Sequence, residues 1–305
     1  MKVFVLGEGM IETRADGALA FGGDALNTAV YMARAGLEPQ FVGALGADAE
    51  SEALLAAWRG EGVGLDHLLR HPTRAPGRYA IAINDRGERS FSYDRDQSAA
   101  RALFQIDGWR ETFEAAAQAD LLYLTGITLS IFTAEDRNLI GDLAAKVRAQ
   151  GGEVAFDPNY RRLGWPSTDA AREAVEHLAT HISIALPSIE DHAALFGDEP
   201  PEDAARRWLR LGAREVVVKL GAGGAYVASA GAEGFVPAAS PARVTDTTAA
   251  GDAFNAAYLA ARLLCGAPPM QAAAAGAALA AEVIGWPGAI APREVGWAGR
   301  KADAQ

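Results

Sequence analysis

Asp246-Thr247-Thr248-Ala249-Ala250-Gly251-Asp252-Ala253-Phe254 joins a run of small residues to a predicted helix. From Phe254 to Leu264 the apolar residues recur with helical spacing, and Gly266 followed by two prolines ends the pattern. Small residues at a helix start let unpaired backbone N–H groups converge, and the helix dipole there favours an anion. The segment therefore predicts a phosphate-binding loop.

Asp252 places a carboxylate at the mouth of this predicted anion site, where a second negative charge would be repelled. A base beside a phosphate is typical of phosphoryl transfer, in which a carboxylate accepts the proton of the attacking hydroxyl. Asp is also a frequent helix N-cap. The spacing alone supports the catalytic and the capping interpretation equally.

The same nine residues resemble the signature Asp-Thr-Thr-Gly-Ala-Gly-Asp-x-Phe of the ribokinase-like (PfkB) carbohydrate kinases, with Ala249 in place of a glycine. That exchange reduces the freedom to adopt positive φ. The resemblance implies a kinase that uses ATP and Mg²⁺. It also implies that Asp252 is the base and that the backbone of Ala249, Ala250 and Gly251 binds the transferred phosphate.

The composition fits one large α/β domain, because half of the 305 residues are hydrophobic and can bury a sizeable core. The net charge of -11 argues against a nucleic-acid partner or an anionic membrane surface. The single cysteine, Cys265, is predicted to be buried and fits a reducing cytoplasm. The first residues predict a strand rather than a signal peptide, and prolines interrupt the uncharged run 263–281.

Strands and helices alternate along most of the chain, which predicts a parallel sheet with helices on both faces. The expected strands are residues 2–6, 41–45, 121–124, 154–156, 182–186 and 215–220. The expected helices are residues 24–35, 51–61, 134–148, 168–178, 188–196, 202–211, 254–264 and 271–283. We expect residues 1–305 to form a single doubly wound domain of the ribokinase-like kind.

A predicted β-hairpin interrupts this alternation. Tyr79, Ile81 and Ile83 alternate with small residues, residues 84–87 have turn composition, and the alternation resumes up to Tyr93. In the resembling family such segments form a small sheet over the sugar. The resemblance thus implies a lid made of residues 74–100 and part of 11–20, and a homo-oligomer formed through it.

Two glycine-marked segments near the N-terminus differ in what they indicate. Gly7-Glu8-Gly9 lacks the third glycine of a dinucleotide fingerprint, because Glu12 stands there, which disfavours a nicotinamide dehydrogenase. Gly22-Gly23 with Asp24 reads by itself as a tight turn with a helix cap. The resemblance implies instead that Gly23, Asp24 and Asn27 hold sugar hydroxyls.

Two arginines, Arg95 and Arg161, suggest an acidic sugar as substrate, because a guanidinium fork matches the geometry of a carboxylate. Taken singly, each fits a solvated surface position better. Residues 91–100 resemble the lid segment Phe-Tyr-Tyr-x-Arg with Ser-Ala-Ala of 2-keto-3-deoxygluconate kinases, and residues 156–161 resemble those enzymes too. Asp94 departs from this pattern, which leaves the identity of the sugar acid open. The resemblance implies that the substrate contacts Tyr79, Tyr93, Arg95 and Arg161.

Two further segments resemble nucleotide-binding parts of these kinases. Residues 219–225 resemble the loop that approaches ATP, which implies contacts from Lys219, Gly221, Gly223 and Gly224; a plain strand-to-strand turn is the alternative. Ser188 and Asp191 stand where the family has Asn-x-x-Glu, a motif tied to magnesium and phosphate. Ser188 is thus a candidate nucleotide contact and Asp191 a candidate for Mg²⁺ through water, whereas a capping serine is an equally good interpretation.

The expected function is ATP-dependent phosphorylation of a sugar acid, with 2-keto-3-deoxygluconate as the first candidate. Two alternatives stay open. One is a neutral-sugar kinase of the same family, such as a fructokinase or ribokinase, against which the two arginines weigh. The other is a catalytically silent sugar-binding relative, against which the presence of Gly251 and Asp252 weighs.

Overall fold

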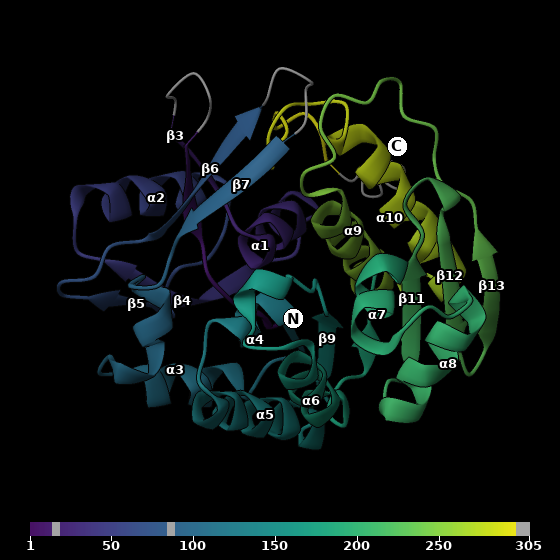
Figure 1. The fold of residues 1–305 in the computed structure, drawn as a ribbon, viewed down its shortest axis with the longest axis horizontal. Coiled ribbons are helices and arrows are strands. Elements are labelled where there is room, and N and C mark those ends of the chain that lie inside the picture. Colours follow the sequence, from purple (N-terminus) through teal and green to yellow (C-terminus); the bar gives the residue numbers. More distant parts are fainter. Residues whose placement is uncertain (14–18, 84–88, 297–305) are drawn as a thin grey trace.

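The computed structural model describes residues 1–13, 19–83 and 89–296, which form two sheets and the helices around them (Figure 1). The larger sheet has nine strands in the order β13-β12-β11-β10-β9-β8-β1-β4-β5. It is parallel except where β12 pairs antiparallel with β11 and with β13. The strands are β1 Val3–Leu6, β4 Pro39–Gly46, β5 Leu68–His71, β8 Leu121–Thr125, β9 Glu153–Asp157, β10 Ile184–Ala185, β11 Glu215–Lys219, β12 Ala225–Ser229 and β13 Ala232–Val236.

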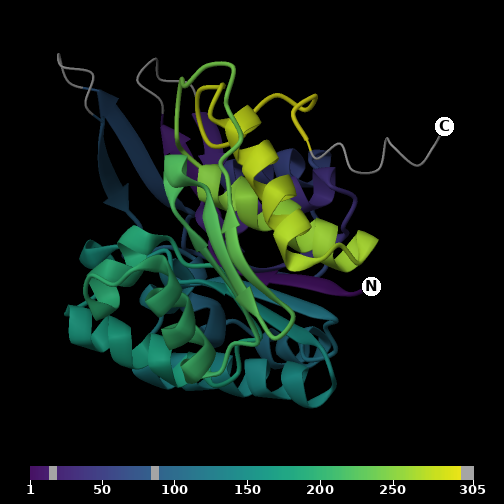
Figure 2. The same cartoon turned by 90° about the vertical axis from the view of Figure 1, so that its right-hand side faces the viewer.

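Helices cover both faces of this sheet, as the alternating pattern predicts (Figure 2). One face carries α1 Asp24–Arg34, α2 Ala49–Gly60, α9 Ala250–Cys265 and α10 Pro269–Val283. The other face carries α3 Trp109–Ala116, α4 Gly126–Ser130, α5 Ala134–Ala149, α6 Thr168–Ala179, α7 Ile189–Phe196 and α8 Pro201–Leu211. The predicted doubly wound, mostly parallel fold is confirmed.

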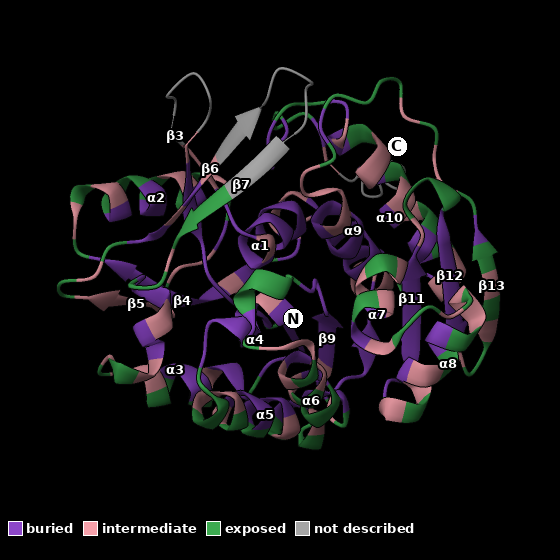
Figure 3. Cartoon of the chain, viewed as in Figure 1, coloured by how far each residue is buried: buried purple, intermediate pink, exposed green. Residues whose placement is uncertain are grey.

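Each face of the sheet has its own hydrophobic core. Val3 and Val5 of β1 pack into the core beneath α1 and α9, whereas Phe4 and Leu6 pack into the core beneath α5 and α6. Successive side chains of a strand point to opposite faces, so a strand covered on both sides must be apolar throughout. Figure 3 shows the buried strands between the two helical layers.

The smaller sheet has four strands in the order β3-β2-β6-β7, in the upper left of Figure 1. The strands are β2 Met10–Thr13, β3 Leu19–Gly22, β6 Gly77–Ile83 and β7 Arg89–Asp94. The predicted hairpin is confirmed, because β6 and β7 pair antiparallel from Arg78 with Asp94 to Ile83 with Arg89. Its turn, 84–88, lies outside the described residues, as do residues 14–18 of the other segment predicted for the lid. Only residues 7–9 separate β2 from β1, so this sheet begins at the carboxyl end of the large one.

Some sequence predictions about the fold were wrong or incomplete. Cys265 is exposed rather than buried, because it is the last residue of α9 and lies beyond the helix-packing face. Strand β10 is two residues long, although five were predicted. The edge strands β5 and β13 were not predicted, and neither was β12, which lies next to β13. Among the described residues, no helix is long and apolar enough to cross a membrane.

The topology indicates that a ligand binds at the carboxyl ends of the strands of the large sheet. The strand order reverses at β1, which lies between β4 and β8, and such a switch point opens a crevice at the carboxyl ends of the strands. Helices α1 and α9 pack side by side above these strand ends (Figure 1). The residues that follow β1, β8, β9 and β11 therefore converge near the N-termini of the two helices.

Candidate active site

Helix α9 begins with an open N-terminus. Ala249 is its N-cap residue, with a left-handed backbone at φ 62°, and no side chain caps the helix. Asp252 is the third residue of the helix rather than its cap. The capping interpretation of Asp252 is therefore wrong, and the first N–H groups of α9 remain accessible to an anion.

Gly251 lies in the first turn of α9, where glycine costs about 1 kcal/mol of helix stability relative to alanine. A Cβ atom added there would meet only Nζ of Lys219 within 4 Å, at 3.5 Å, which is ordinary van der Waals contact. The packing of the protein therefore does not require glycine at this position. A glycine here keeps the space next to the backbone N–H groups free for the atoms of a ligand.

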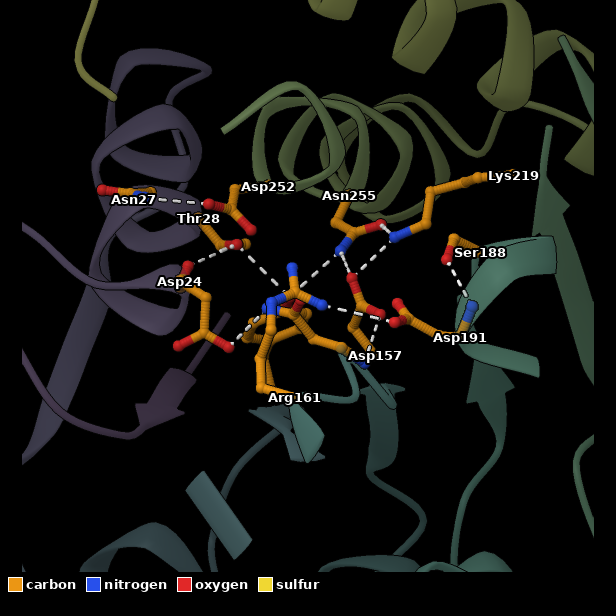
Figure 4. Close-up of polar contacts among 12 residues, drawn as sticks. Asp24, Asn27, Thr28, Asp157, Arg161, Ser188, Asp191, Lys219, Asp252 and Asn255 are labelled. Atoms are coloured by element: carbon orange, nitrogen blue, oxygen red, sulfur yellow. Dashed lines mark hydrogen bonds and ion pairs between the residues drawn. The ribbon is translucent and has the colours of Figure 1, made fainter. Parts of the chain in front are cut away.

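Asp252 is a buried carboxylate, 8% exposed, held by one polar partner (Figure 4). Nδ2 of Asn27 donates a hydrogen bond to its Oδ2 at 2.8 Å. Burial and the negative charges of Asp24 and Asp157 raise the pKa of Asp252 to about 7, although the Asn27 hydrogen bond and the charge of Lys219 oppose this. A carboxylate with a pKa near neutrality is suited to accept a proton from a hydroxyl group.

The start of α1 lies beside Asp252 because of a glycine. Gly23 has φ 122°, and a Cβ atom on it would lie 2.5 Å from the backbone oxygen of Glu8. No other residue fits this turn without displacing the chain. Oδ2 of Asp24 accepts a hydrogen bond of 2.8 Å from Asn159, which follows β9. The three residues Gly23, Asp24 and Asn27 thus lie together at the same edge of the sheet as Asp252.

Two buried glutamates hold the residues that were predicted to contact the sugar from the small sheet. The hydroxyl of Tyr79 donates a hydrogen bond of 2.5 Å to Oε2 of Glu12. Nη2 of Arg95 lies 2.5 Å from Oε2 of Glu8, and the Arg95 side chain is only 15% exposed. Tyr93, in contrast, is 48% exposed. The sequence reasoning missed both glutamates as site residues, although two carboxylates directly after the first apolar strand were a visible signal.

Arg161 is the exposed member of the predicted arginine pair, with 56% of its side chain accessible. Its Nη1 donates to the backbone oxygen of Tyr160 at 2.8 Å and to Oδ1 of Asp191 at 3.3 Å. Figure 4 shows its guanidinium between Asp24 on one side and Asp157 and Asp191 on the other. It therefore presents N–H donors at the entrance of the site.

Ser188 and Asp191 form a helix cap. The backbone N–H of Asp191 donates to Oγ of Ser188 at 3.0 Å, and Ser188 is the N-cap of α7. Burial and the charge of Asp157 raise the pKa of Asp191. Residues 1–13, 19–83 and 89–296 contain no group of three or more His, Cys, Asp and Glu side chains that could hold a metal ion.

The structure separates Lys219 from the glycine loop with which it was grouped. Its Nζ donates to Oδ2 of Asp157 at 2.6 Å and to Oδ1 of Asn255 at 3.1 Å, behind the first turn of α9. In the loop itself, Gly221 has open space around it, whereas a Cβ atom on Gly224 would lie 2.1 Å from a backbone oxygen of β13. Gly224 therefore meets a need of the fold, and Gly221 leaves the loop open to a ligand. Gly223 lies between them, in a short 3₁₀ turn.

Ala249→Gly is expected to increase the free energy of unfolding by about 0.5–1 kcal/mol, because it relieves the left-handed strain of an alanine. Ala250→Gly, one residue into the helix, provides the matched control and should lower stability by a similar amount. Urea unfolding of both variants measures the two changes. A loss of stability in both would mean that Ala249 is not strained.

The chain is similar to known proteins over nearly its whole length. The sequence pattern of the family described as pfkB family carbohydrate kinase matches residues 6–295. The 2-dehydro-3-deoxygluconokinases of Escherichia coli (strain K12) and Dickeya dadantii (strain 3937) are 41% and 38% identical to the chain. The alignments cover 96% of this chain in both cases, and 98% and 97% of the relatives. The solved structure of a PfkB protein from Polaromonas sp. JS666 superposes with a TM-score of 0.82 and 31% identity, covering 95% of this chain and 98% of that one.

The uncapped start of α9, the buried carboxylate in its first turn and the match over nearly the whole chain lead to one assignment. The chain belongs to the pfkB family of carbohydrate kinases.

Proposed function

We propose that the protein transfers the γ-phosphate of ATP to the 6-hydroxyl group of 2-keto-3-deoxygluconate, also named 2-dehydro-3-deoxygluconate. The observation that carries the proposal is Asp252, a buried carboxylate with a pKa of about 7 at an uncapped helix N-terminus. The names of the Escherichia coli and Dickeya dadantii relatives support the choice of substrate.

In the proposed reaction Asp252 accepts the proton of the sugar hydroxyl. Asn27 already occupies its Oδ2, so Oδ1 is the oxygen available for the proton. The hydroxyl oxygen forms a bond to the γ-phosphorus while the bond to ADP breaks. The N–H groups at the start of α9, from Ala249 to Asp252, stabilise the charge on the transferred phosphoryl group, a contribution that needs no reorganisation during the reaction.

The sugar acid would bind between the two sheets. Gly23, Asp24 and Asn27 are placed to hold its hydroxyl groups, with Tyr79 and Tyr93 on the side of the small sheet. Its carboxylate would be recognised by Arg95 and Arg161, since a bidentate guanidinium contact is a strong and directional one. We further propose that the small sheet acts as a lid and that its outer face joins two copies of the chain.

The nucleotide would lie along the loop at Gly221, Gly223 and Gly224 and near Ser188, with Lys219 behind the phosphates. A magnesium ion that accompanies ATP would need few protein ligands, because Mg²⁺ keeps much of its hydration and binds mainly to phosphates. Asp191 would contact it through water, and the ion would neutralise phosphate charge. We place the protein in the cytoplasm, where ATP is available.

A panel of aldonic and ketodeoxy sugar acids, assayed for ADP release, tests the proposal. We expect 2-keto-3-deoxygluconate to give the highest kcat/KM, and neutral sugars such as fructose and ribose to be poor substrates. Preferential turnover of a neutral sugar would overturn the acid assignment. No ADP release with any sugar, while sugar binding persists, would indicate a silent relative instead.

A further inference from the structure

Three buried polar residues from three distant elements meet below the first turn of α9 (Figure 4). Asp157 ends β9, Lys219 ends β11 and Asn255 lies on α9. Oδ2 of Asp157 accepts hydrogen bonds from Nζ of Lys219 at 2.6 Å and from Nδ2 of Asn255 at 2.7 Å. Oδ1 of Asn255 accepts from Lys219 at 3.1 Å, which closes the triangle.

This triangle is close to the base and to the anion site. Asn255 follows Asp252 by three residues, so both side chains leave the helix on the same side. Nζ of Lys219 lies 3.5 Å from where a Cβ of Gly251 would be. Nδ2 of Asn255 also donates to the hydroxyl of Tyr123 at 3.1 Å, and Thr28 of α1 donates to that hydroxyl at 3.2 Å. The contacts thus connect the two helices that carry Asn27 and Asp252.

Stability alone does not explain an ion pair at this depth. Removing two charges from water costs about as much as their attraction returns, and apolar side chains of similar size often stabilise a protein as well or better. The pair is nevertheless placed directly beneath the one buried carboxylate that would carry out the chemistry.

We propose that Asp157 and Lys219 are positioning residues of the kinase, which with Asn255 fix the first turn of α9 to the sheet and balance the charge around Asp252. The inference deepens the proposed function and rests on it. Neither residue needs to touch the sugar or the phosphates to act in this way.

The charges that face Asp252 come from three elements. Asp24 of α1 and Asp157 of β9 raise the pKa of Asp252, and Lys219 of β11 lowers it. Burial raises it as the largest cause, and the neutral Asn27 lowers it. The two members of one ion pair therefore act on the base in opposite directions. Because both charges lie close to Asp252, removing either one should move the pKa of this carboxyl, whereas removing an ion pair far from Asp252 should not.

The test is a titration of Asp252 in the full chain, followed by NMR with ¹³C-carboxyl-labelled aspartate and assigned with Asp252→Asn. Asp157→Asn should lower the midpoint by about one pH unit, and Lys219→Met should raise it by about one. In the double variant that combines Asp157→Asn with Lys219→Met, Asp252 should titrate near its wild-type midpoint. Arg262→Met is the matched control, because Arg262 also links α9 to β11 through an ion pair, with Glu215, at the far end of the helix. It should leave the midpoint unchanged.

The acid limb of the kcat–pH profile should move in the same directions as the NMR midpoints. Shifts of the same sign in both single variants, or no shift in either, would overturn the proposal. Thermal unfolding checks that each variant is folded. If Lys219→Met does not fold, Lys219→Arg replaces it, and because this variant keeps the charge, Asp252 should titrate at the wild-type midpoint. Opposite NMR shifts in a protein that phosphorylates no sugar acid would contradict the proposed function while supporting the placement of the charges.

Discussion

Asp252→Asn is expected to lower kcat for the sugar acid by roughly 10²–10⁴-fold. Asparagine has the size of aspartate but cannot accept the hydroxyl proton, so the loss falls on the chemical step. Sugar affinity should change little, because the residues proposed to hold the sugar remain. Steady-state kinetics with calorimetric sugar binding measures both quantities. An unchanged kcat would remove Asp252 from the role of base.

The wild-type enzyme should show the titration of this group directly. In the proposed reaction the ionised carboxylate is the active form, and the pKa of Asp252 is about 7. The value of kcat/KM should therefore fall about tenfold for each pH unit below 7.

The substitution Asp252→Asn should also stabilise the folded protein at alkaline pH. The pKa of Asp252 is about 7 in the folded protein and 3.8 in an unperturbed side chain, so the folded state binds the proton more tightly. The free energy of unfolding therefore falls as the pH rises from about 4 to 7. Above pH 7 the protein bears the whole loss of stability that comes from ionising the buried Asp252. We expect Asp252→Asn to be more stable than the wild type by roughly 1–3 kcal/mol at pH 8, with a difference that narrows toward pH 4. Urea unfolding across this range checks the sign.

Arg161→Ala is expected to raise KM for the acid sugar by roughly 10–100-fold with a smaller change in kcat, the loss typical of a charged hydrogen bond. The side chain is largely exposed, so stability should not change. A neutral ketose serves as the control substrate, because its KM should be the same in both proteins. If KM for the acid is unchanged, the carboxylate is not recognised by Arg161.

Arg95→Ala should produce a similar rise in KM and an additional loss of stability of about 3–5 kcal/mol, since it leaves the Glu8 carboxylate buried without its cation. The double variant Glu8→Gln with Arg95→Met removes both charges. It should recover stability but not affinity for the acid. Recovery of affinity in the double variant would show that Arg95 supports the fold alone.

The sequence indicated the position of the candidate site best where the information is local. Residues 246–254 are consecutive, and their small residues predicted an anion site at a helix start, although the helix begins at Ala250 rather than at Phe254 and Asp252 lies in its first turn. The buried pairs of Glu8 with Arg95 and of Asp157 with Lys219 were not predicted. Each pair joins residues that are 62 or more positions apart in the sequence, and no spacing rule predicts contacts between such residues. The roles assigned to Tyr93, Gly221 and Asp191 stay predictions.

The same difference between local and long-range information explains which parts of the fold could be predicted. Long helices such as α5 were predicted to within a residue, because three or more turns of one periodicity outweigh local exceptions. Strands at the edge of the sheet were missed for a physical reason. In β13 a glutamate and a glycine interrupt the apolar residues, and only pairing with β12 makes this segment a strand.

The hydrogen bond between Asn27 and Asp252 joins residues 225 positions apart. A chain emerging from a ribosome folds from its N-terminal end, so α1 is complete long before α9 exists. The proposed base and the amides proposed to bind the phosphate are then made together, on the same late helix. A translation product that ends before α9 lacks both groups, and we expect it to phosphorylate no sugar.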